Sequence, residues 1–138
     1  MTSINEVKEI VEGLLRLQDK ILQKEPQLLE EAKEEVGNVA QIEIYSLHGN
    51  YVERLKLDDG LRIVRTNEEP KHVIRMHIDT FIDLLIGERD GEPFDFGKAY
   101  MMGLIEFNGV DYHFHAMKWA KAFERLRKYI NIGNIRRG

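Results

Sequence analysis

The sequence predicts an α+β domain with a mostly antiparallel sheet, and three observations lead to this fold class. Apolar residues recur at helical spacing near the N-terminus, the spacing changes to every second residue over residues 40–78, and short helical segments follow. Strands that cluster in one part of a chain, rather than alternating with helices, are typical of this class. No repeat, low-complexity tract or linker interrupts the 138 residues, so we expect a single domain over residues 1–138.

The chain opens with signals for a helix. Ser3-Ile4-Asn5-Glu6 is a capping box, in which a hydroxyl and a carboxylate can each satisfy a backbone amide that lacks a helical partner. The apolar residues that follow at helical spacing are Ile4, Val7, Val11, Leu14, Leu15, Ile21 and Leu22. Pro26 ends this helix, because proline disfavours helix at the residue before it, and a second short helix is predicted over residues 26–36.

Four strands are predicted next, because apolar and polar residues alternate between turn sequences. They span residues 40–46, 51–57, 61–65 and 72–78. In the second strand, one side carries Tyr51, Glu53, Leu55 and Leu57. The glycines of His48-Gly49-Asn50 and Asp58-Asp59-Gly60 favour turns between the first three strands.

The remaining elements are short. Asp79-Thr80 is expected to cap a helix that Gly87 ends, and a loop over residues 88–93 leads to a second helix over residues 94–102. Strands are predicted over residues 104–107 and 112–116 around a turn at Asn108-Gly109. A final helix is predicted over residues 118–129.

Composition excludes several classes of function. The chain has no cysteine, which excludes a disulfide framework, a thiolate nucleophile, a cysteine zinc site and an iron–sulfur cluster. It has no glycine-rich phosphate loop, so nucleotide chemistry is not expected. No apolar run approaches the ~18 residues of a membrane span, and no signal peptide is recognisable at the start, so we expect a cytoplasmic protein.

Charge is unevenly distributed along the chain. Residues 1–69 carry 15 acidic and 9 basic residues, whereas the last 21 residues carry seven basic residues and one acidic residue. Four of the basic residues recur on one side of the predicted final helix: Lys118, Lys121, Arg125 and Lys128. This basic stripe indicates contact with an anionic membrane surface, with an ordinary solvated helix face as the alternative. Nucleic acid is not an expected partner.

Two histidines supply a chemical alternative. On a strand over residues 112–116, His113 and His115 would point to the same side and could share a metal, with His77 or Asp111 as a third ligand. A small metal-dependent enzyme is therefore one hypothesis. The other interpretation, that these histidines cover a solvated sheet face, is the commoner case, and we expect neither a metal nor another cofactor.

Residues 81–123 hold more apolar side chains than two short helices and a strand need. Such an excess can fill a thick core, line a cavity for an apolar ligand or form the interface of a homodimer. If it lines a cavity, the expected ligand-binding residues are Phe81, Leu84, Leu85, Tyr100, Met101, Met102, Leu104, Phe107, Phe114, Met117, Trp119 and Phe123.

Three segments resemble the sterol carrier protein type two family of small lipid carriers. These are residues 73–87 (VIRMHIDTFIDLLIG), residues 99–109 (AYMMGLIEFNG), and the path from residues 26–29 into the strand at residues 40–44. The resemblance implies a five-stranded, mainly antiparallel sheet covered by helices, with a hydrophobic cavity between them. It also implies a noncatalytic protein that binds, and transfers, a fatty acid, a fatty acyl derivative or a sterol-like ligand.

Overall fold

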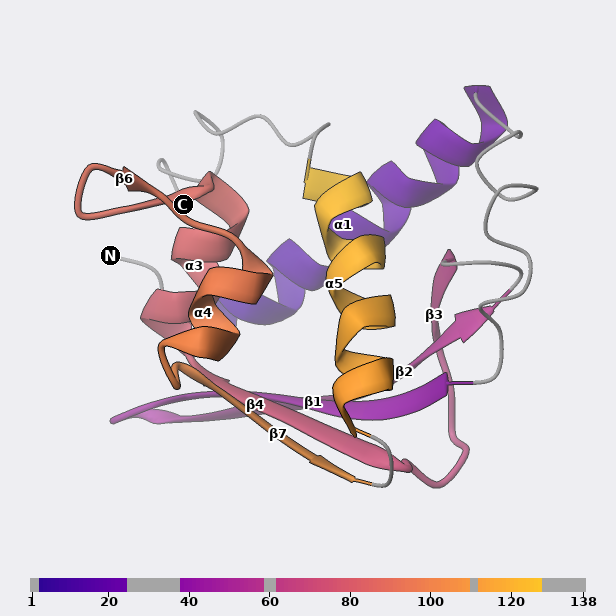
Figure 1. The fold of residues 1–138 in the computed structure, drawn as a ribbon. Coiled ribbons are helices and arrows are strands. Elements are labelled where there is room, and N and C mark those ends of the chain that lie inside the picture. The colour runs from indigo at the N-terminus through magenta and orange to yellow at the C-terminus, as the bar shows by residue number, and fades with distance from the viewer. Residues whose placement is uncertain (1–2, 25–37, 59–61, 110–111, 128–138) are drawn as a thin grey trace.

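The computed structural model describes residues 3–24, 38–58, 62–109 and 112–127, and within them the chain forms one five-stranded sheet with helices on one face (Figure 1). The helices are α1 (Ile4–Lys24), α3 (Ile78–Ile86), α4 (Phe96–Met101) and α5 (Tyr112–Arg127). The strands of the sheet are β1 (Asn38–Ser46), β2 (Gly49–Asp58), β3 (Arg62–Arg65), β4 (His72–His77) and β7 (Ile105–Gly109). A separate small hairpin consists of β5 (Glu88–Arg89) and β6 (Glu92–Pro93).

The order of the sheet is β3-β2-β1-β4-β7. Within it β1 and β4 are parallel, and the three other pairs of neighbours are antiparallel. The parallel pair arises because the chain leaves β3 at one edge and returns on the far side of β1. The predicted α+β class and the five-stranded, mainly antiparallel sheet are therefore confirmed.

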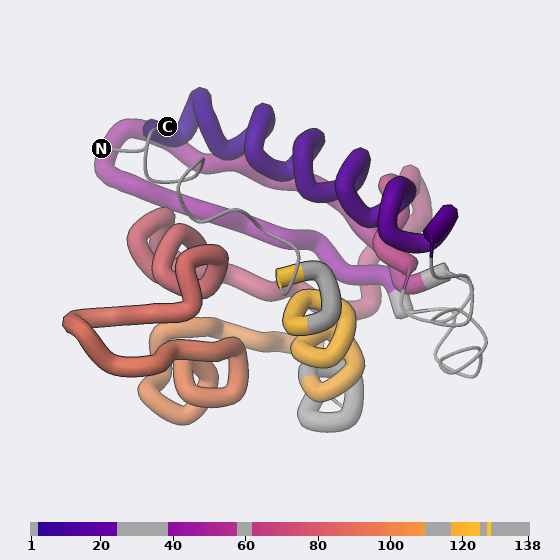
Figure 2. Tube along the Cα trace, turned by 90° about the horizontal axis from the view of Figure 1, so that it is seen from above, coloured from indigo at the N-terminus to yellow at the C-terminus, as the bar shows by residue number. Residues whose placement is uncertain are grey.

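The helices divide the inner face of the sheet between them. Figure 2, seen from above, shows α1 running along the strands on the β1 and β2 side, while α3, α4 and α5 gather over the other half. The contacts agree, because α1 contacts β2 and β3, α3 contacts β1 and β4, and both α4 and α5 contact β7. Helix α5 rises from the sheet near the end of β7 (Figure 1). No helix covers the other, outer face among the residues described.

Helix α1 begins where the sequence predicts, but only half of the predicted capping box forms, because the Glu6 amide donates to the Ser3 carbonyl (3.0 Å) and not to the Ser3 hydroxyl. The Ser3 amide and hydroxyl both contact the Glu6 carboxylate, at 3.3 and 3.2 Å from Oε1. The apolar stripe of the helix faces the sheet, with Val7 fully buried. The second helix predicted over residues 26–36 lies outside the described residues.

A buried glutamine joins α1 to the edge strand β3. Gln18 is only 4% exposed, and its amide makes two hydrogen bonds to one residue. Its Nε2 donates to the Ile63 carbonyl (2.7 Å), and its Oε1 accepts from the Ile63 amide (2.8 Å). A glutamine side chain thus satisfies two buried backbone groups at the edge of the sheet.

The structure corrects two predictions near α3. The N-cap is His77 rather than Asp79-Thr80, because the His77 Nδ1 accepts a hydrogen bond from the Asp79 amide (3.0 Å). Gly87 ends the helix with a left-handed φ of 81°, as predicted. The predicted loop over residues 88–93 is the β5–β6 hairpin, whose turn residues Asp90 and Gly91 both have positive φ (52° and 80°). Asp-Gly is the sequence that such a turn favours.

Residues 112–116 form the first part of α5, so the strand predicted there is wrong. Five residues in which aromatic and histidine side chains alternate fit a strand, but a segment so short also fits a helix. The continuation decides between them, because Trp119 and Ala122 are buried three residues apart, at helical spacing. The final helix therefore begins six residues earlier than predicted, at Tyr112.

Candidate functional site

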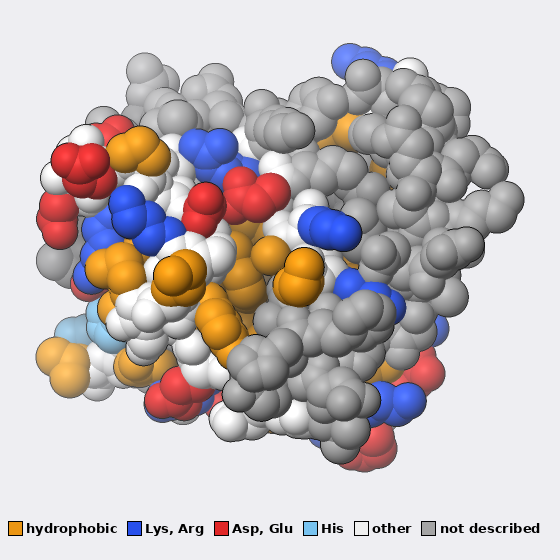
Figure 3. Space-filling view, in the orientation of Figure 1, with side chains coloured by type: hydrophobic (Ala, Val, Ile, Leu, Met, Phe, Trp, Pro, Cys, Tyr) orange, Lys and Arg blue, Asp and Glu red, His pale blue; other side chains and the backbone are white. Residues whose placement is uncertain are grey.

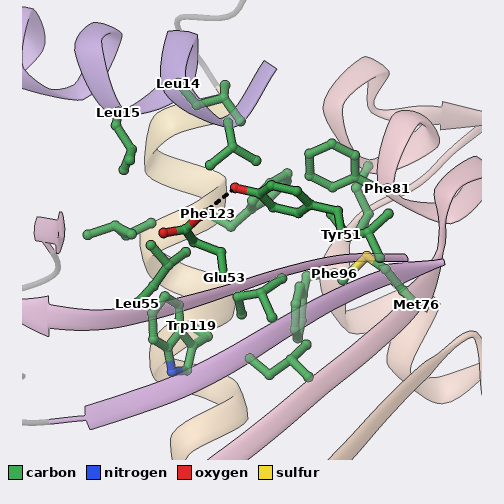
Figure 4. A pocket seen from close by; sticks show the side chains of 16 residues that line it. Leu14, Leu15, Tyr51, Glu53, Leu55, Met76, Phe81, Phe96, Trp119 and Phe123 are labelled. Atoms are coloured by element: carbon green, nitrogen blue, oxygen red, sulfur yellow. Dashed lines mark hydrogen bonds between the residues drawn. The ribbon is translucent and has the colours of Figure 1, made fainter. Parts of the chain in front are cut away.

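An apolar cavity of about 90 Å³ lies between the inner face of the sheet and the helices. Strands β1, β2, β3 and β4 supply its floor, and α1, α3, α4 and α5 supply its walls (Figure 4). Its lining consists of Val11, Leu14, Leu15, Ile42, Ile44, Tyr51, Glu53, Leu55, Ile63, Ile74, Met76, Phe81, Leu84, Phe96, Trp119 and Phe123. The place of the cavity agrees with what the resemblance implied.

The lining contains one polar pair, on strand β2. The Tyr51 hydroxyl donates a hydrogen bond to Glu53 Oε2 at 2.9 Å (Figure 4). The other carboxylate oxygen, Oε1, lies 3.1 Å from the Nε of Arg65, which is on β3. The same arginine reaches α1, where its Nη2 lies 3.4 Å from Glu12 Oε1. We call Tyr51, Glu53, Arg65 and Glu12 the polar wall.

Tyr51 is a weaker acid than an ordinary tyrosine, chiefly because it is buried. Burial raises the pKa of the Tyr51 hydroxyl well above its ordinary value of 10.0, and the hydrogen bond to Glu53 and the charge of Glu53 raise it further. Arg65 acts in the opposite direction and is outweighed. The shift therefore matters only in alkaline solution, where an ordinary tyrosine loses its proton and Tyr51 keeps both its proton and its bond to the carboxylate.

Four of the twelve residues predicted to bind a ligand line this cavity. They are Phe81, Leu84, Trp119 and Phe123. Three further residues, Met101, Met102 and Met117, are exposed to solvent, and Leu85 and Phe107 are buried in the core away from the cavity lining. Tyr100 and Leu104 pack against the core from its edge, and the side chain of Phe114 lies outside the described residues.

The exposed methionines contribute to the surface instead. Met101 ends α4, Met102 follows it, and Met117 lies on α5. Hydrophobic side chains are visible among acidic and basic ones on the face formed by α3, α4 and α5 (Figure 3). A dense apolar composition in this part of the sequence therefore reflects both the core and an exposed surface.

Sequence reasoning missed twelve of the sixteen lining residues, and nine of these twelve come from α1 and strands β1 to β3. Leu14 and Leu15 of α1 were part of the predicted apolar stripe, but nothing local shows that a stripe borders a cavity rather than a filled core. Glu53 carried a usable signal. It shares the side of β2 that holds Leu55 and Leu57, and an acidic residue in the apolar register of a strand indicates an unusual environment.

Comparison with known proteins identifies the architecture. No family model matches the sequence, and no curated protein matches it in sequence. Among solved structures, a crystal structure of sterol carrier protein 2 aligns with a TM-score of 0.53 and 16% identity, over 84% of this chain and 92% of that chain. The sterol carrier protein domain 2 of Helicoverpa armigera aligns with a TM-score of 0.50 and 15% identity, over 87% and 89%. The chain has the sterol carrier protein 2 fold.

A third structure extends the range of proteins with this fold. The UbiJ-SCP2 ubiquinone synthesis protein aligns with a TM-score of 0.54 and 14% identity, over 88% of this chain and 96% of that chain. At such low identity the likeness concerns the backbone alone. The residues that line the cavity of this sterol carrier protein 2 fold must therefore be considered on their own chemistry.

The geometry offers no metal site in the described part of the chain. No group of three or more histidine, aspartate or glutamate side chains there is close enough to hold an ion. Positions 113 and 115 lie in α5, where residues two apart are separated by roughly 200° around the helix axis. The metal hypothesis required positions 113 and 115 to share one face of a strand, but residues 112–116 form a helix.

The basic stripe is only partly described. Lys118 is half-buried and Lys121 is exposed on α5, whereas the side chain of Arg125 and all of Lys128 lie outside the described residues. Within the described ranges, none of the helices combines the length and the apolar composition that crossing a membrane requires.

The indole of Trp119 is the remaining polar group at the cavity. Its Nε1 is buried and has no hydrogen-bond partner among the described residues. Figure 4 shows this nitrogen on the side of the ring away from Tyr51 and Glu53. The cavity therefore meets the apolar part of the indole, and Trp119, the only tryptophan in the chain, can report on what occupies the cavity.

Proposed function

We propose that the protein binds an apolar, lipid-like ligand in the cavity and performs no chemistry on it. The observation that carries the proposal is the cavity itself, which apolar side chains from four strands and four helices surround. Pockets for small apolar ligands are lined in this way, with few polar groups. The structures with the same fold include proteins named sterol carriers, which supports the same class of ligand.

Ligand entry requires the cavity to widen. A volume of about 90 Å³ is below the roughly 300–1,000 Å³ of typical ligand sites, so a long chain must displace lining side chains. Trp119 and Phe123 of α5 lie across the cavity from Leu14 and Leu15 of α1, and α1 and α5 are in contact. We expect a ligand to enter between these two helices and to move them apart.

The experiment is a titration followed by the fluorescence of Trp119. A long-chain ligand should change the emission saturably, with micromolar-class affinity, about −8 kcal/mol. Leu15→Phe fills the cavity from α1 and should weaken binding at least tenfold without loss of thermal stability, because added apolar volume occupies existing space. Leu47→Phe is the matched control, since Leu47 is 97% exposed in the turn between β1 and β2.

Two outcomes would contradict the proposal. One is the absence of any saturable change with a fatty acid, a fatty alcohol, an acyl-CoA or a sterol. The other is equal binding by the wild type and Leu15→Phe. Native mass spectrometry of the purified protein tests the remaining alternatives directly, because a bound lipid, a bound metal and a homodimer each give a different mass.

Delivery of the ligand to an anionic membrane is the second part of the proposal. Lys121 is exposed near the middle of α5, and the half-buried Lys118 lies one turn before it, so this side of the helix can approach negatively charged lipid, at about 1 kcal/mol per charge. Vesicles of anionic lipid should sediment with the protein at low salt, and neutral vesicles should not. Lys121→Glu with Arg125→Glu should abolish this binding, while Lys20→Glu on α1 should not; equal binding to both vesicle types would refute it.

A further inference from the structure

The inner surface of the cavity is almost wholly apolar. Thirteen of its sixteen lining side chains carry no nitrogen or oxygen, and the other three belong to Tyr51, Glu53 and Trp119. Within the polar wall, the Tyr51 hydroxyl already donates to the Glu53 carboxylate, which Arg65 also contacts. The Trp119 nitrogen lies on the side of its ring away from Tyr51 and Glu53 (Figure 4). A polar group placed inside the cavity would therefore find almost no partner.

The lack of polar partners restricts which part of a ligand can enter. A hydroxyl group loses its hydrogen bonds to water when it moves into an apolar space, and a carboxylate or an ammonium group loses more. An amphiphilic ligand avoids this cost if only its hydrocarbon part enters the cavity and its head group stays in water. The cavity thus favours the tail of such a ligand, and it makes no contact that would distinguish one head group from another.

The lining residues define the direction in which a tail would enter. Leu14 and Leu15 of α1 are only partly buried, and they lie on the side of the cavity where α1 meets α5. Met76 of β4 and Phe96 of α4 are buried on the opposite side (Figure 4). A chain that enters between α1 and α5 therefore directs its terminal methyl group towards Met76, whose unbranched side chain adapts easily to a new neighbour.

The volume of the cavity restricts the shape of the ligand. An apolar cavity of about 150 Å³ holds a benzene ring. A cavity of about 90 Å³ therefore takes only a few methylene groups before the lining has to move. A flexible chain displaces the lining one methylene at a time, and each step buries further apolar surface. The fused rings of a sterol are rigid, so a sterol requires the whole space at once.

We infer that the ligand is a flexible, unbranched hydrocarbon chain that enters tail first and leaves its head group in water. The inference rests on the proposed function and sharpens it, because it selects acyl and alkyl chains over sterols. It also specifies what the site recognises. Ligands are distinguished by the far end of the chain, which the cavity surrounds, and not by the head group, which stays outside.

The test compares dodecanoic acid with two relatives that each differ from it at one end. Dodecanol has another head group, and its affinity should lie within about threefold of that of the acid, because both head groups stay in water. 12-Hydroxydodecanoic acid keeps the head group but carries a hydroxyl at the far end, so it should bind more weakly by about tenfold or more. The fluorescence of Trp119, which lines the cavity, follows each titration.

Three results would overturn the inference and leave the proposed function intact. The first is binding of 12-hydroxydodecanoic acid within about threefold of dodecanoic acid, because the far end would then not be buried among apolar groups. The second is a larger difference than about threefold between dodecanoic acid and dodecanol, since the head group would then contact the protein. The third is displacement of dodecanoic acid by cholesterol. Absence of binding by every one of these ligands would overturn the proposed function, and the inference with it.

A pair of variants tests where the far end of the chain lies. Met76→Gln places an amide of similar shape in the lining, where it can bond the hydroxyl of 12-hydroxydodecanoic acid, so the penalty on that ligand should fall by about fivefold. Met101→Gln is the matched control and should keep the full penalty, because Met101 is 87% exposed and outside the lining. An unchanged penalty in a folded Met76→Gln protein would overturn the tail-first direction. If Met76→Gln does not fold, the three ligands on the wild type still decide the inference.

Discussion

The two faces of the sheet carry similar polar groups in different surroundings. On the outer face, Arg75 lies 3.7 Å from the carboxylates of Glu43 and Glu106, and its guanidinium carbon lies 3.9 Å from the centre of the Tyr45 ring. On the inner face, Arg65 lies 3.1 Å from Glu53, which in turn accepts a hydrogen bond from Tyr51. Each of these two clusters thus contains one arginine, one tyrosine and two glutamates, since Glu12 of α1 also pairs with Arg65.

The surroundings of the two clusters differ in one respect. The charged groups of the two clusters are about equally open to water, because Arg65 is 44% exposed and Arg75 36%, and Glu53 is 23% exposed and Glu43 25%. The clusters differ in what they border, since Tyr51 and Glu53 line the apolar cavity and no described helix covers the outer cluster. The same residue types therefore lie on an uncovered face of the sheet on one side and beside an apolar cavity on the other.

The largest expected difference between the faces concerns apolar packing on β2. Leu57 is fully buried on the inner face and Val52 is 50% exposed on the outer face of the same strand. Leu57→Ala should lower the free energy of unfolding by about 2–5 kcal/mol, and Val52→Ala by no more than about 0.5 kcal/mol. Urea denaturation of both variants checks this, and similar losses would mean that the helices do not shield the inner face.

A smaller difference is expected for the two arginines. Arg65→Met removes the pairs to both Glu53 and Glu12 beside the cavity, but Arg65 is 44% exposed and water replaces part of the pairing, so the loss of stability should be about 1 kcal/mol. Arg75→Met removes solvent-facing pairs and should cost about 0–1 kcal/mol. Thermal and urea unfolding of the two arginine variants measure both losses of stability. If Arg75→Met were the more damaging variant, the outer cluster would be structural and the comparison would be reversed.

The smallest effect concerns tyrosine ionisation. Because the pKa of Tyr51 is raised in the folded protein, the folded state holds its proton more tightly than the unfolded state does. Its contribution to stability is complete below pH 10 and declines as the pH rises above the ordinary tyrosine value of 10.0. Tyr51→Phe should flatten this alkaline decline. Tyr45→Phe on the outer face is the control, and an equal change in both variants would remove the distinction between the faces.

The sequence predicts most helices and strands because local residue patterns determine them. Alternation over residues 40–78 identifies the strands of the sheet to within a few residues, since every second side chain is buried. The capping box and Gly87 mark helix ends through backbone chemistry that depends on neighbouring residues alone. The strand prediction for residues 112–116 is wrong because five alternating residues fit the spacing of a strand and that of a helix. Only the rest of α5 decides between the two.

The cavity was predicted less completely because it is built from distant parts of the chain. Apolar density over residues 81–123 leads to Phe81 and Trp119, but the same density includes Met101, which is 87% exposed. Which apolar residues face an unfilled space depends on how α1 and α5 lie over the sheet, and no local spacing encodes that. Glu53 is the exception, because its position in an apolar register is visible in the sequence itself.

The pairing of Gln18 with Ile63 has a consequence for self-association. An edge strand with free amides and carbonyls is a template on which another chain can add a strand, and such addition begins many aggregates. At Ile63 both backbone groups are already bonded to the Gln18 side chain, and Asp19 pairs with the neighbouring Arg62 at 2.9 Å. Helix α1 therefore blocks the addition of a strand at Ile63 on the β3 edge. If α1 detaches, two copies of the protein are expected to associate through this edge.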